Sequence, residues 1–243
     1  MKFSAVALAF VAASEAAVDF SKLGDLPDFG KFDLGSLFGE KEDFVKGGKC
    51  KPITIAEIEE AQNGWGWGLV AIGAAYAEAF NTLPNSNTTF VTKAEQVISE
   101  FYNYGKSNVL FKPTLTTPPN QFRPTFQGAL SYFVGPWAPE PIDGDPGFAL
   151  GPDCGMQTPP LQEPCPWVDV RFENNGTLLF KDTALAMGNY FFTPGNGTQD
   201  GAPSMVEYSF AYVKDPKTCY LKIVLQHSSV PFMAPDAASM MGR

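Results

Sequence analysis

The chain has 243 residues, 44% of them hydrophobic, enough for one domain of ordinary size with tails or for two small domains. Its 26 acidic and 17 basic residues give a net charge of −9. This balance argues against nucleic acid as a partner, because binding to phosphate backbones depends on Lys and Arg. The single histidine, His227, excludes a zinc site built from three histidines of one chain.

Residues 1–17 have the features of a signal peptide. Lys2 is followed by an apolar run from Ala5 to Ala13 and by small residues before Glu15. A buried helix is the alternative, and the run is shorter than the ~20 apolar residues that span a bilayer. We expect the chain to enter the secretory pathway, to end in a lumen, outside the cell or in the plastid of an alga, and to keep no membrane span once processed.

Four cysteines agree with an oxidising compartment. Cys154 and Cys165 flank a loop rich in Pro and Gly, so a bridge between them would close a short insertion. Cys50 and Cys219 would then pair with each other or remain free. Four cysteines allow three connectivities, and the sequence leaves all three open.

Residues 51–232 form the predicted folded domain. Residues 18–50 carry Phe or Leu every three to six positions among Gly, Asp and Lys, and the repeated Gly breaks any long helix. We interpret them as a mobile leader, with a short amphipathic docking segment as the alternative. Residues 233–243 are predicted to be a flexible tail.

A long helix is predicted at the start of the domain. Thr54 and Glu57 form a capping box, and apolar residues then recur every three or four positions from Ile55 to Phe80. Three glycines inside this helix each cost about 1 kcal/mol relative to Ala. They are Gly64, Gly66 and Gly68. They indicate that another element packs very closely against this part of the helix.

Two shorter helices are expected after it. Thr92 and Glu95 form a second capping box, and the helix that they begin runs to Gly105. The third helix follows Thr125. Its apolar side is made of Phe126, Ala129, Leu130 and Phe133.

The second half of the domain has the period of strands. Side chains alternate from Trp167 to Phe172, and Asn175-Gly176, a strong hairpin signal, precedes a returning run up to Phe180. Three more strands are predicted over residues 184–192, 205–213 and 220–230. Three helices followed by an antiparallel meander predict an α+β fold. In such a fold, a long helix across a strongly curved sheet leaves a conical cavity closed at one end.

Alternation in the last predicted strand places a histidine and a serine at the end of an apolar face. One face carries Ile223, Leu225, His227 and Ser229, and the other carries Lys222, Val224, Gln226, Ser228 and Val230. We therefore expect the His227 imidazole and the Ser229 hydroxyl to enter the concave side of the sheet. A histidine held by hydrogen bonds in the core is the alternative. A Ser-His-acid hydrolase is a poorer interpretation, because the chain has no Gly-x-Ser-x-Gly motif.

Three further polar residues stand among apolar neighbours. Pro113 and Pro124 favour extended backbone around Thr114 and Arg123, and loop anchoring explains Thr114 as well as a functional role does. Tyr132 lies beside the packing face of the third predicted helix. Its ring can be buried there while its hydroxyl reaches into the cavity.

Six blocks of sequence occur in an order that resembles one enzyme family. They are Lys112–Leu115, Phe122–Thr125, Ala129–Gly135, Val170–Asn174, Ala186–Phe192 and His227–Ser229. Together they resemble the iota-class carbonic anhydrases of diatoms, other algae, cyanobacteria and bacteria. The resemblance covers residues 54–232.

The resemblance implies a cone-shaped fold like that of nuclear transport factor 2, association as a homodimer, and interconversion of CO2 and bicarbonate. Members of the family that work without metal use a threonine, a tyrosine and a serine around the bound bicarbonate, and we expect this chain to work without a metal. By motif these are Thr114, Tyr132 and one serine of the His-Ser-Ser run. Alternation favours Ser229, and a bulge in the strand would put Ser228 in its place.

The remaining candidate residues take supporting roles in this hypothesis. His227 would shuttle protons or orient the serine, Ser228 would assist in substrate binding, and Arg123 would either attract the anion or cap a loop. Manganese and zinc are not favoured as cofactors, because Gln226 stands where the family usually carries a further histidine.

Two other functions fit a cone of this kind. A non-catalytic association or small-molecule-binding module can have the same scaffold, since a fold alone does not confer chemistry. A proton-abstracting isomerase needs a carboxylate that projects into the cavity. Glu207 and Asp169 are the strand candidates for that role.

Overall fold

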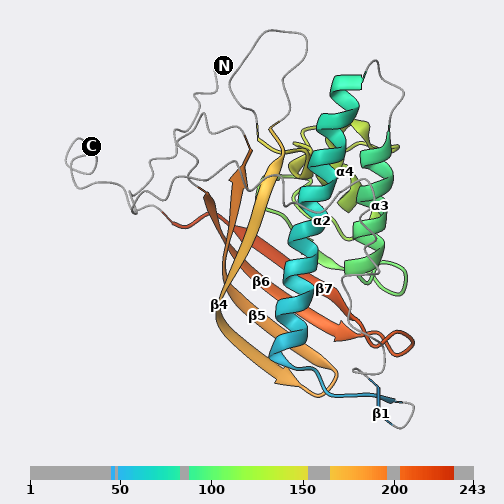
Figure 1. Ribbon diagram of the computed structural model, residues 1–243, viewed down its shortest axis with the longest axis vertical. Coiled ribbons are helices and arrows are strands. Elements are labelled where there is room, and N and C mark those ends of the chain that lie inside the picture. The colour runs from blue at the N-terminus through green and yellow to red at the C-terminus, as the bar shows by residue number, and fades with distance from the viewer. Residues whose placement is uncertain (1–44, 47–48, 83–87, 153–164, 196–202, 233–243) are drawn as a thin grey trace, which may run out of the picture.

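The computed structural model describes residues 45–46, 49–82, 88–152, 165–195 and 203–232 (Figure 1). The predicted signal peptide (1–17), most of the predicted leader (18–50) and the predicted tail (233–243) lie outside the described residues. So does Cys154. The two short strands β1 (Val45–Lys46) and β2 (Lys49–Cys50) pair antiparallel at the end of the predicted leader.

Three α-helices and two short 3-10 helices are formed: α2 (Ile55–Thr82), α3 (Thr89–Phe101), α4 (Phe126–Val134), η3 (Gly135–Trp137) and η4 (Phe148–Leu150). The capping box of α2 is confirmed. The backbone N–H of Thr54 donates to Glu57 Oε2 (2.7 Å), and that of Glu57 donates to Thr54 Oγ1 (3.3 Å). Thr125 caps α4 by accepting from the N–H of Gly128 at 3.2 Å. In the described part of the chain, the helices all lack an apolar stretch long enough to cross a membrane.

The second helix begins one turn earlier than the sequence predicts. Because α3 starts at Thr89, Thr92 lies inside it, and the predicted capping box at Thr92 and Glu95 is wrong. The additional turn buries Phe90 and Val91 in the core. Burial of these two side chains therefore outweighs the local capping signal.

Five strands form one sheet in the order β3-β7-β6-β5-β4. They are β3 (Leu110–Lys112), β4 (Trp167–Phe180), β5 (Thr183–Pro194), β6 (Ser204–Lys214) and β7 (Leu221–Ser229). β3 runs parallel to β7, and all other neighbours are antiparallel. The last three strands are confirmed, with ends shifted by one or two residues.

The hairpin predicted at Asn175-Gly176 is wrong. β4 continues through this dipeptide as one strand, with a register shift against β5 between Asn174 and Gly176. The chain turns later, between Phe180 and Thr183, which pair with each other. The side-chain amides of Asn174 and Gln62 on α2 donate to each other's oxygens, both at 2.9 Å. This contact from a distant helix accompanies the bulge at the dipeptide.

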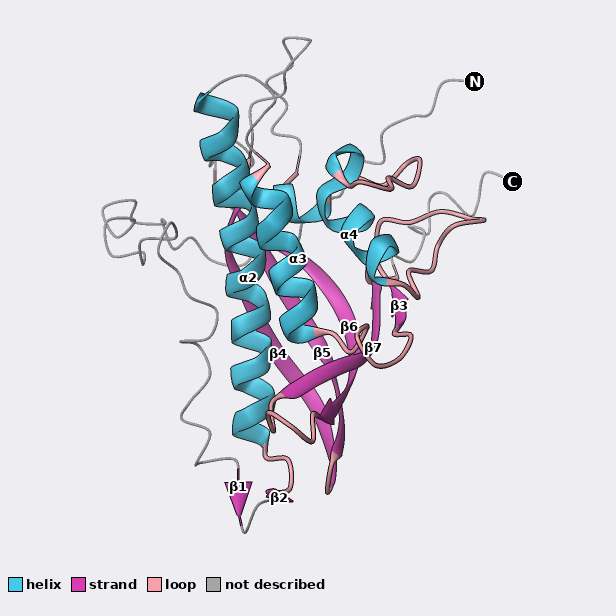
Figure 2. Cartoon of the chain, turned by 90° about the vertical axis from the view of Figure 1, so that its right-hand side faces the viewer, coloured by secondary structure: helices cyan, strands magenta, loops and turns pink. Residues whose placement is uncertain are grey.

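The helices cover one face of a strongly curved sheet (Figures 1 and 2), and this arrangement confirms the α+β fold class. Two of the predicted glycines permit the close packing. A Cβ on Gly68 would stand 2.9 Å from Val97 of α3, and one on Gly66 would stand 3.0 Å from Val170 of β4. α2 is thus held closely by the neighbouring helix on one side and by the sheet on the other.

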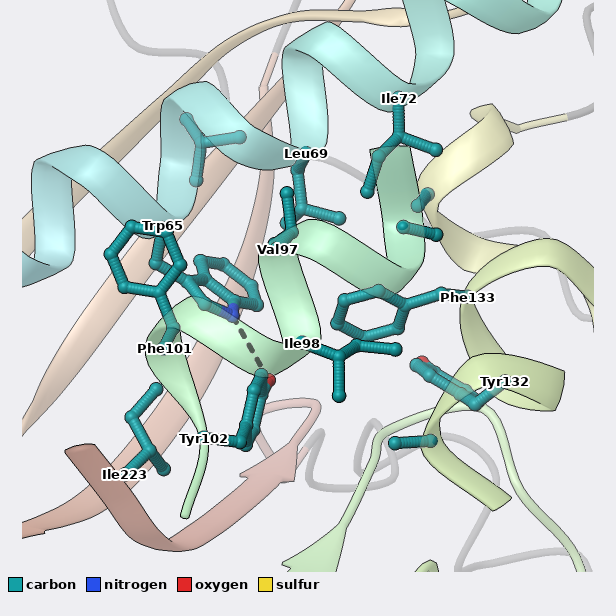
Figure 3. Packing of buried hydrophobic residues seen from close by; sticks show 14 of the residues in the cluster. Trp65, Leu69, Ile72, Val97, Ile98, Phe101, Tyr102, Tyr132, Phe133 and Ile223 are labelled. Atoms are coloured by element: carbon teal, nitrogen blue, oxygen red, sulfur yellow. Dashed lines mark hydrogen bonds between the residues drawn. The ribbon is translucent and has the colours of Figure 1, made fainter. Parts of the chain in front are cut away.

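The core between helices and sheet is rich in aromatic rings (Figure 3). Trp65 of α2 is 1% exposed and lies 5.9–6.4 Å, centroid to centroid, from four rings of the sheet. They are Phe172, Tyr190, Phe192 and Phe210. Tyr102, which follows α3, packs against Phe111 and Phe133. The core therefore contains tyrosine hydroxyls that must find partners inside the protein.

A disulfide joins Cys50 of β2 to Cys219, just before β7. Cys165 is also disulfide-bonded, and the predicted bridge to Cys154 involves a residue outside the described chain. The pairing of Cys50 with Cys219, which the sequence left open, fastens the start of the domain to its last strand.

Candidate active site

A bulge in β7 decides which side chains face the helices. β7 pairs with β6 through Ile223 and Leu225 on either side of a register shift, which leaves Val224 between them. Beyond this point the alternation is inverted. Gln226 and Ser228 are each 2% exposed and lie on the concave side.

His227 and Ser229 therefore project to the outer face, and the prediction that they enter the concave side is wrong. The imidazole of His227 is exposed opposite Ser209 of β6. Ser229 Oγ donates to the exposed carboxylate of Glu207 at 2.8 Å. Neither group contacts the interior, so a proton shuttle through His227 has no support in this geometry. The serine on the inner face is Ser228, as a bulge requires.

Ser228 belongs to a cluster of hydroxyls around Tyr190 of β5. The Tyr190 hydroxyl hydrogen-bonds directly to Ser228 Oγ. Burial raises the pKa of Tyr190 to about 12, while the nearby polar side chains of Ser228, Gln226 and Thr114 work in the opposite direction. At neutral pH the tyrosine is therefore protonated and can donate a hydrogen bond.

Thr114 and Tyr132 complete this cluster. Thr114 follows β3, is half-buried and lies near enough to Tyr190 to work against the rise of its pKa. Tyr132 of α4 is 3% exposed, and its ring lies edge-on to that of Phe111 of β3 with centroids 5.8 Å apart. Burial raises the pKa of Tyr132 well above its ordinary value, and Tyr190 nearby adds to the rise. The structure thus brings together three predicted residues, Thr114, Tyr132 and Ser228.

An apolar cleft of about 580 Å³ leads to this cluster. Its lining includes Thr114, Leu115, Phe148, Trp167, Phe192 and Val206. Tyr132 stacks on Phe148 with ring centroids 5.5 Å apart, and Tyr190 packs edge-on against Phe192 at 4.7 Å. The two tyrosines therefore stand directly behind aromatic rings of the wall, and Thr114 joins the cluster to the cleft.

Arg123 anchors a loop and does not face the cleft. Its guanidinium forms a bidentate ion pair with Asp145, and both side chains are at most 2% exposed. Its third nitrogen, Nη1, donates to the backbone carbonyls of Asn120 and Phe122. Asp145 also accepts from Ser131 Oγ at 2.5 Å. Of the two roles left open for Arg123, the structure supports the loop cap.

The two carboxylates proposed for an isomerase lie outside the cavity, because Glu207 and Asp169 are both exposed. The isomerase alternative therefore has no base in this site. Over residues 45–232, as far as the structure describes them, no cluster of three His, Cys, Asp or Glu side chains could hold a metal ion. The polar side chains that line the cleft are neutral: the hydroxyls of Tyr76, Thr114 and Ser204 and the indoles of Trp137 and Trp167.

Tyr190 and Gln226 are the site residues that sequence reasoning missed. Tyr190 lies in one of the resembling blocks and shares a face with Ala184, Ala186 and Phe192, which are all buried. Alternation along β5 could have placed it inside. Gln226 was placed on the wrong face, because the bulge at Val224 is not visible in the sequence.

Three comparisons relate the chain to known proteins. The profile of a family described as metal-independent carbonic anhydrase matches residues 56–230. A metal-independent carbonic anhydrase of Nostoc sp. is 34% identical over 182 residues, which are 75% of this chain and 76% of that protein. The crystal structure of an iota-carbonic anhydrase from a cyanobacterium, complexed with bicarbonate, has a TM-score of 0.60 and 34% identity over 75% of this chain and 95% of that one. A putative calcium/calmodulin-dependent protein kinase II association domain from Xanthomonas campestris is 18% identical with a TM-score of 0.39, a likeness that carries no argument.

Proposed function

Because the chain belongs to the metal-independent carbonic anhydrase family, we propose that it interconverts CO2 and bicarbonate at the inner end of the cleft. The hydroxyls of Thr114, Tyr132 and Ser228 bind and polarise the substrate. They stabilise the charge that develops on the substrate, one of the roles of the metal ion in a zinc enzyme. CO2 is apolar and bicarbonate is an anion, so the site needs both an apolar approach and hydrogen-bond donors.

Hydration joins the oxygen of one water molecule to the carbon of CO2 and releases one proton to the solvent. Negative charge develops on the oxygens of CO2 as this bond forms. Neutral hydroxyl donors that already point at these oxygens stabilise the charge, and one such donor contributes about 2.7–4 kcal/mol in other enzymes. Burial keeps Tyr132 and Tyr190 protonated by raising both pKa values.

The observation that carries this proposal is the meeting of Thr114, Tyr132 and Ser228 around one buried tyrosine. These residues come from the end of β3, from α4 and from β7, and Thr114 also forms part of the cleft wall. The wall is aromatic and apolar, which suits a neutral gas. The bicarbonate anion that forms from CO2 needs hydrogen-bond partners when it is buried, and the cluster of neutral hydroxyls behind this wall can provide them.

Stopped-flow CO2 hydration on the purified chain, with and without a chelator, tests the proposal. We expect activity that the chelator leaves unchanged and that Tyr132→Phe lowers about 10²-fold, the cost of losing one preorganised donor. Tyr220→Phe is the matched control, because Tyr220 is only half-buried, lies before β7 and does not line the cleft. An inactive wild-type protein that still binds bicarbonate would indicate the non-catalytic binding module instead.

We further propose that the chain forms a homodimer through the outer face of the sheet. A row of apolar side chains crosses all five strands in register and consists of Leu178, Leu185, Ala211, Leu225 and Leu110. Leu178 is 61% exposed and Leu110 is 68% exposed. A continuous apolar row of this length on a monomer supports burial against a second copy. Light scattering should give twice the monomer mass, and Leu185→Asp should reduce it to one copy while Phe122→Asp, on an exposed loop, should not.

The proposed compartment is oxidising, reached through the secretory pathway and ending in a lumen, outside the cell or in a plastid. The Cys50–Cys219 disulfide supports this proposal, since such bonds persist in oxidising compartments. A fluorescent fusion of the full chain should leave the cytosol, and the same fusion without residues 1–17 should stay there. Equal distribution of the two fusions would contradict the proposal.

A further inference from the structure

We propose that the apolar cleft is also a binding site for a flat, uncharged aromatic molecule, which competes with inorganic carbon for the approach to the hydroxyl cluster. The binding does not depend on the proposed function, whereas the competition rests on it. The size of the cleft, the charge of its lining and the rigidity of one of its walls point to a ligand of this kind.

The cleft is far larger than the proposed substrate needs. Its volume is about 580 Å³, within the range of about 300–1,000 Å³ that is typical of sites for drug-sized molecules. CO2 and bicarbonate are little larger than a water molecule, whose share of the liquid is about 30 Å³. The cleft therefore has room for a molecule many times larger than either form of inorganic carbon.

The lining of the cleft favours a ligand without charge. The described residues that form it include no Asp, Glu, Lys, Arg or His. An organic ion held against this surface would lose its hydration and gain no charged partner, which is unfavourable. The hydroxyls of Tyr76, Thr114 and Ser204 can form hydrogen bonds with a polar group of a neutral ligand.

Aromatic rings in the lining favour a ligand that is flat and aromatic. Those of Phe148, Trp167 and Phe192 form one group, with centroids 5.1–5.6 Å apart. Those of Tyr76 and Trp137 form a second group, with centroids 6.4 Å apart. Aromatic rings attract one another edge-on or offset at centroid distances of about 4.5–7 Å. A further ring in the cleft can therefore join either group.

Part of the apolar lining is in contact with water. Trp137 is 39% exposed, Met205 is 41% exposed, and Leu115 and Val230 are each 53% exposed. Apolar side chains that gather in this way around a hollow are typical of a binding site. A neutral ligand that covers them removes their surface from water, and this burial favours binding.

One wall of the cleft is fixed before any ligand arrives. Gly151, which follows η4, has a φ of 98°, and a Cβ there would stand 1.8 Å from the carbonyl oxygen of Cys165. The indole N–H of Trp167 donates to the carbonyl of Phe148 at 2.7 Å. These contacts hold η4 and the start of β4 together. Binding therefore does not have to order this wall, and less free energy is lost on association.

Two dyes with the same rings test the charge of the ligand. N-phenyl-1-naphthylamine is uncharged and fluoresces strongly in apolar sites, and 8-anilinonaphthalene-1-sulfonate carries the same rings with a sulfonate. Fluorescence titration of the purified chain gives the Kd and the number of sites for each dye. We expect one saturable site per chain for the uncharged dye, and a Kd about tenfold higher or more for the sulfonate, because its charge finds no partner. Equal Kd values for the two dyes would overturn the preference for a neutral ligand.

Substitutions locate the dye in the cleft. Trp137→Ala removes an exposed ring of the lining and should raise the Kd of the uncharged dye about tenfold, the effect of one aromatic contact. Phe180→Ala is the matched control and should change this Kd by less than about twofold. Phe180 is 54% exposed and is the last residue of β4, whereas Trp167 at the cleft is the first. If Trp137→Ala fails to fold, Val230→Asp places a charge in the lining and should raise the Kd as much.

Inhibition of CO2 hydration tests the competition. In stopped-flow assays the uncharged dye should lower kcat/KM, with half of the effect at its Kd, and Trp137→Ala should shift this midpoint by the same factor as the Kd. A dye that binds and leaves kcat/KM unchanged would overturn the competition.

Dye binding without turnover separates this site from the proposed function. An active wild-type protein without a saturable dye site would overturn the site alone, and its cleft would then be filled by another part of this chain or by a second copy. Equal dye binding by the wild type and Trp137→Ala would also overturn the site. An inactive wild-type protein whose dye binding depends on Trp137 would overturn the proposed function and leave the site in place.

Discussion

The hydroxyl of Tyr190 on β5 hydrogen-bonds to that of Ser228 on β7, although β6 lies between the two strands. In the register, Tyr190 pairs with Val206 and Ser228 pairs with Tyr208. The contact therefore runs diagonally across the middle strand. The strong curvature of the sheet (Figure 1) brings the side chains of its concave face together, and a tyrosine is long enough to span the distance.

The two adjacent serines of β7 should differ sharply on substitution. Ser228→Ala removes a buried donor next to Tyr190 and should lower kcat/KM for CO2 hydration about 10²-fold. Ser229→Ala only breaks an exposed hydrogen bond to Glu207 on the outer face, so activity should stay within twofold. Stopped-flow hydration assays on both variants measure this difference. The reverse order of effects would show that the β7 bulge is absent in solution.

His227 provides a second prediction on the same strand. Its imidazole is exposed on the outer face and lies opposite Ser209. His227→Ala should therefore leave kcat for hydration unchanged, because the imidazole does not reach the cluster of hydroxyls on the concave face. A loss of activity that added imidazole restores would instead assign a proton shuttle to His227.

The buried tyrosines should make the stability of the fold depend on pH in alkaline solution. Burial raises the pKa of Tyr190 from 10.0 to about 12 and raises that of Tyr132 as well. Their stabilising contribution is complete below pH 10, where tyrosines of the unfolded chain are also neutral. Above pH 10 the unfolded chain loses these protons first, so the free energy of unfolding should fall by about 1.4 kcal/mol per pH unit for each such tyrosine.

Urea unfolding at pH 8, 9, 10 and 11 measures this dependence. The wild type should change little between pH 8 and pH 9 and then lose stability, and Tyr190→Phe should lose less per pH unit. Equal slopes for the two proteins above pH 10 would mean that Tyr190 titrates alike in the folded and unfolded chains.

The ion pair between Arg123 and Asp145 should matter for stability. Both side chains are at most 2% exposed, and removing one partner of a buried pair costs about 3–5 kcal/mol. Asp145→Asn should therefore lower the midpoint of urea unfolding markedly. The hydration activity of the fraction that remains folded should stay close to that of the wild type, since Arg123 points to Asp145 and to backbone carbonyls. Lost activity in a fully folded variant would restore a substrate role for Arg123.

Local signals predicted most of the elements in this fold. The capping residues Thr54 and Thr125 mark true helix starts, because the hydrogen bonds of a cap involve residues only three positions away. Alternation likewise identified the strands after residue 183. These features depend on neighbours in the sequence and little else.

The site itself depends on contacts that no local pattern contains. One unpaired residue, Val224, exchanges the faces of Ser228 and Ser229, and its position is set by pairing with β6. The hydroxyl cluster depends in the same way on Tyr190, which meets the serine only after the sheet curves. The resemblance identified the residue types of the site but did not decide between Ser228 and Ser229. The bulge in β7 decides between them, because it places Ser228 on the concave face.

The bulge of β4 offers a test of the strand that replaced the predicted hairpin. Gly188 of β5 lies against the backbone of β4, where a Cβ would stand 2.0 Å from the carbonyl oxygen of Glu173. Gly188→Ala must therefore push the two strands apart, and we expect it to destabilise the protein by at least the 1–3 kcal/mol or so of an overpacked site. Gly176, across the same bulge, has open space around its Cβ position. Gly176→Ala should change the free energy of unfolding by less than about 0.5 kcal/mol, as exposed substitutions do. Urea unfolding of the two variants measures both losses of stability. A hairpin at Asn175-Gly176 would make the loss larger for Gly176→Ala than for Gly188→Ala. In a hairpin, Gly176 would need the positive φ of a tight turn, and Gly188 would not contact β4.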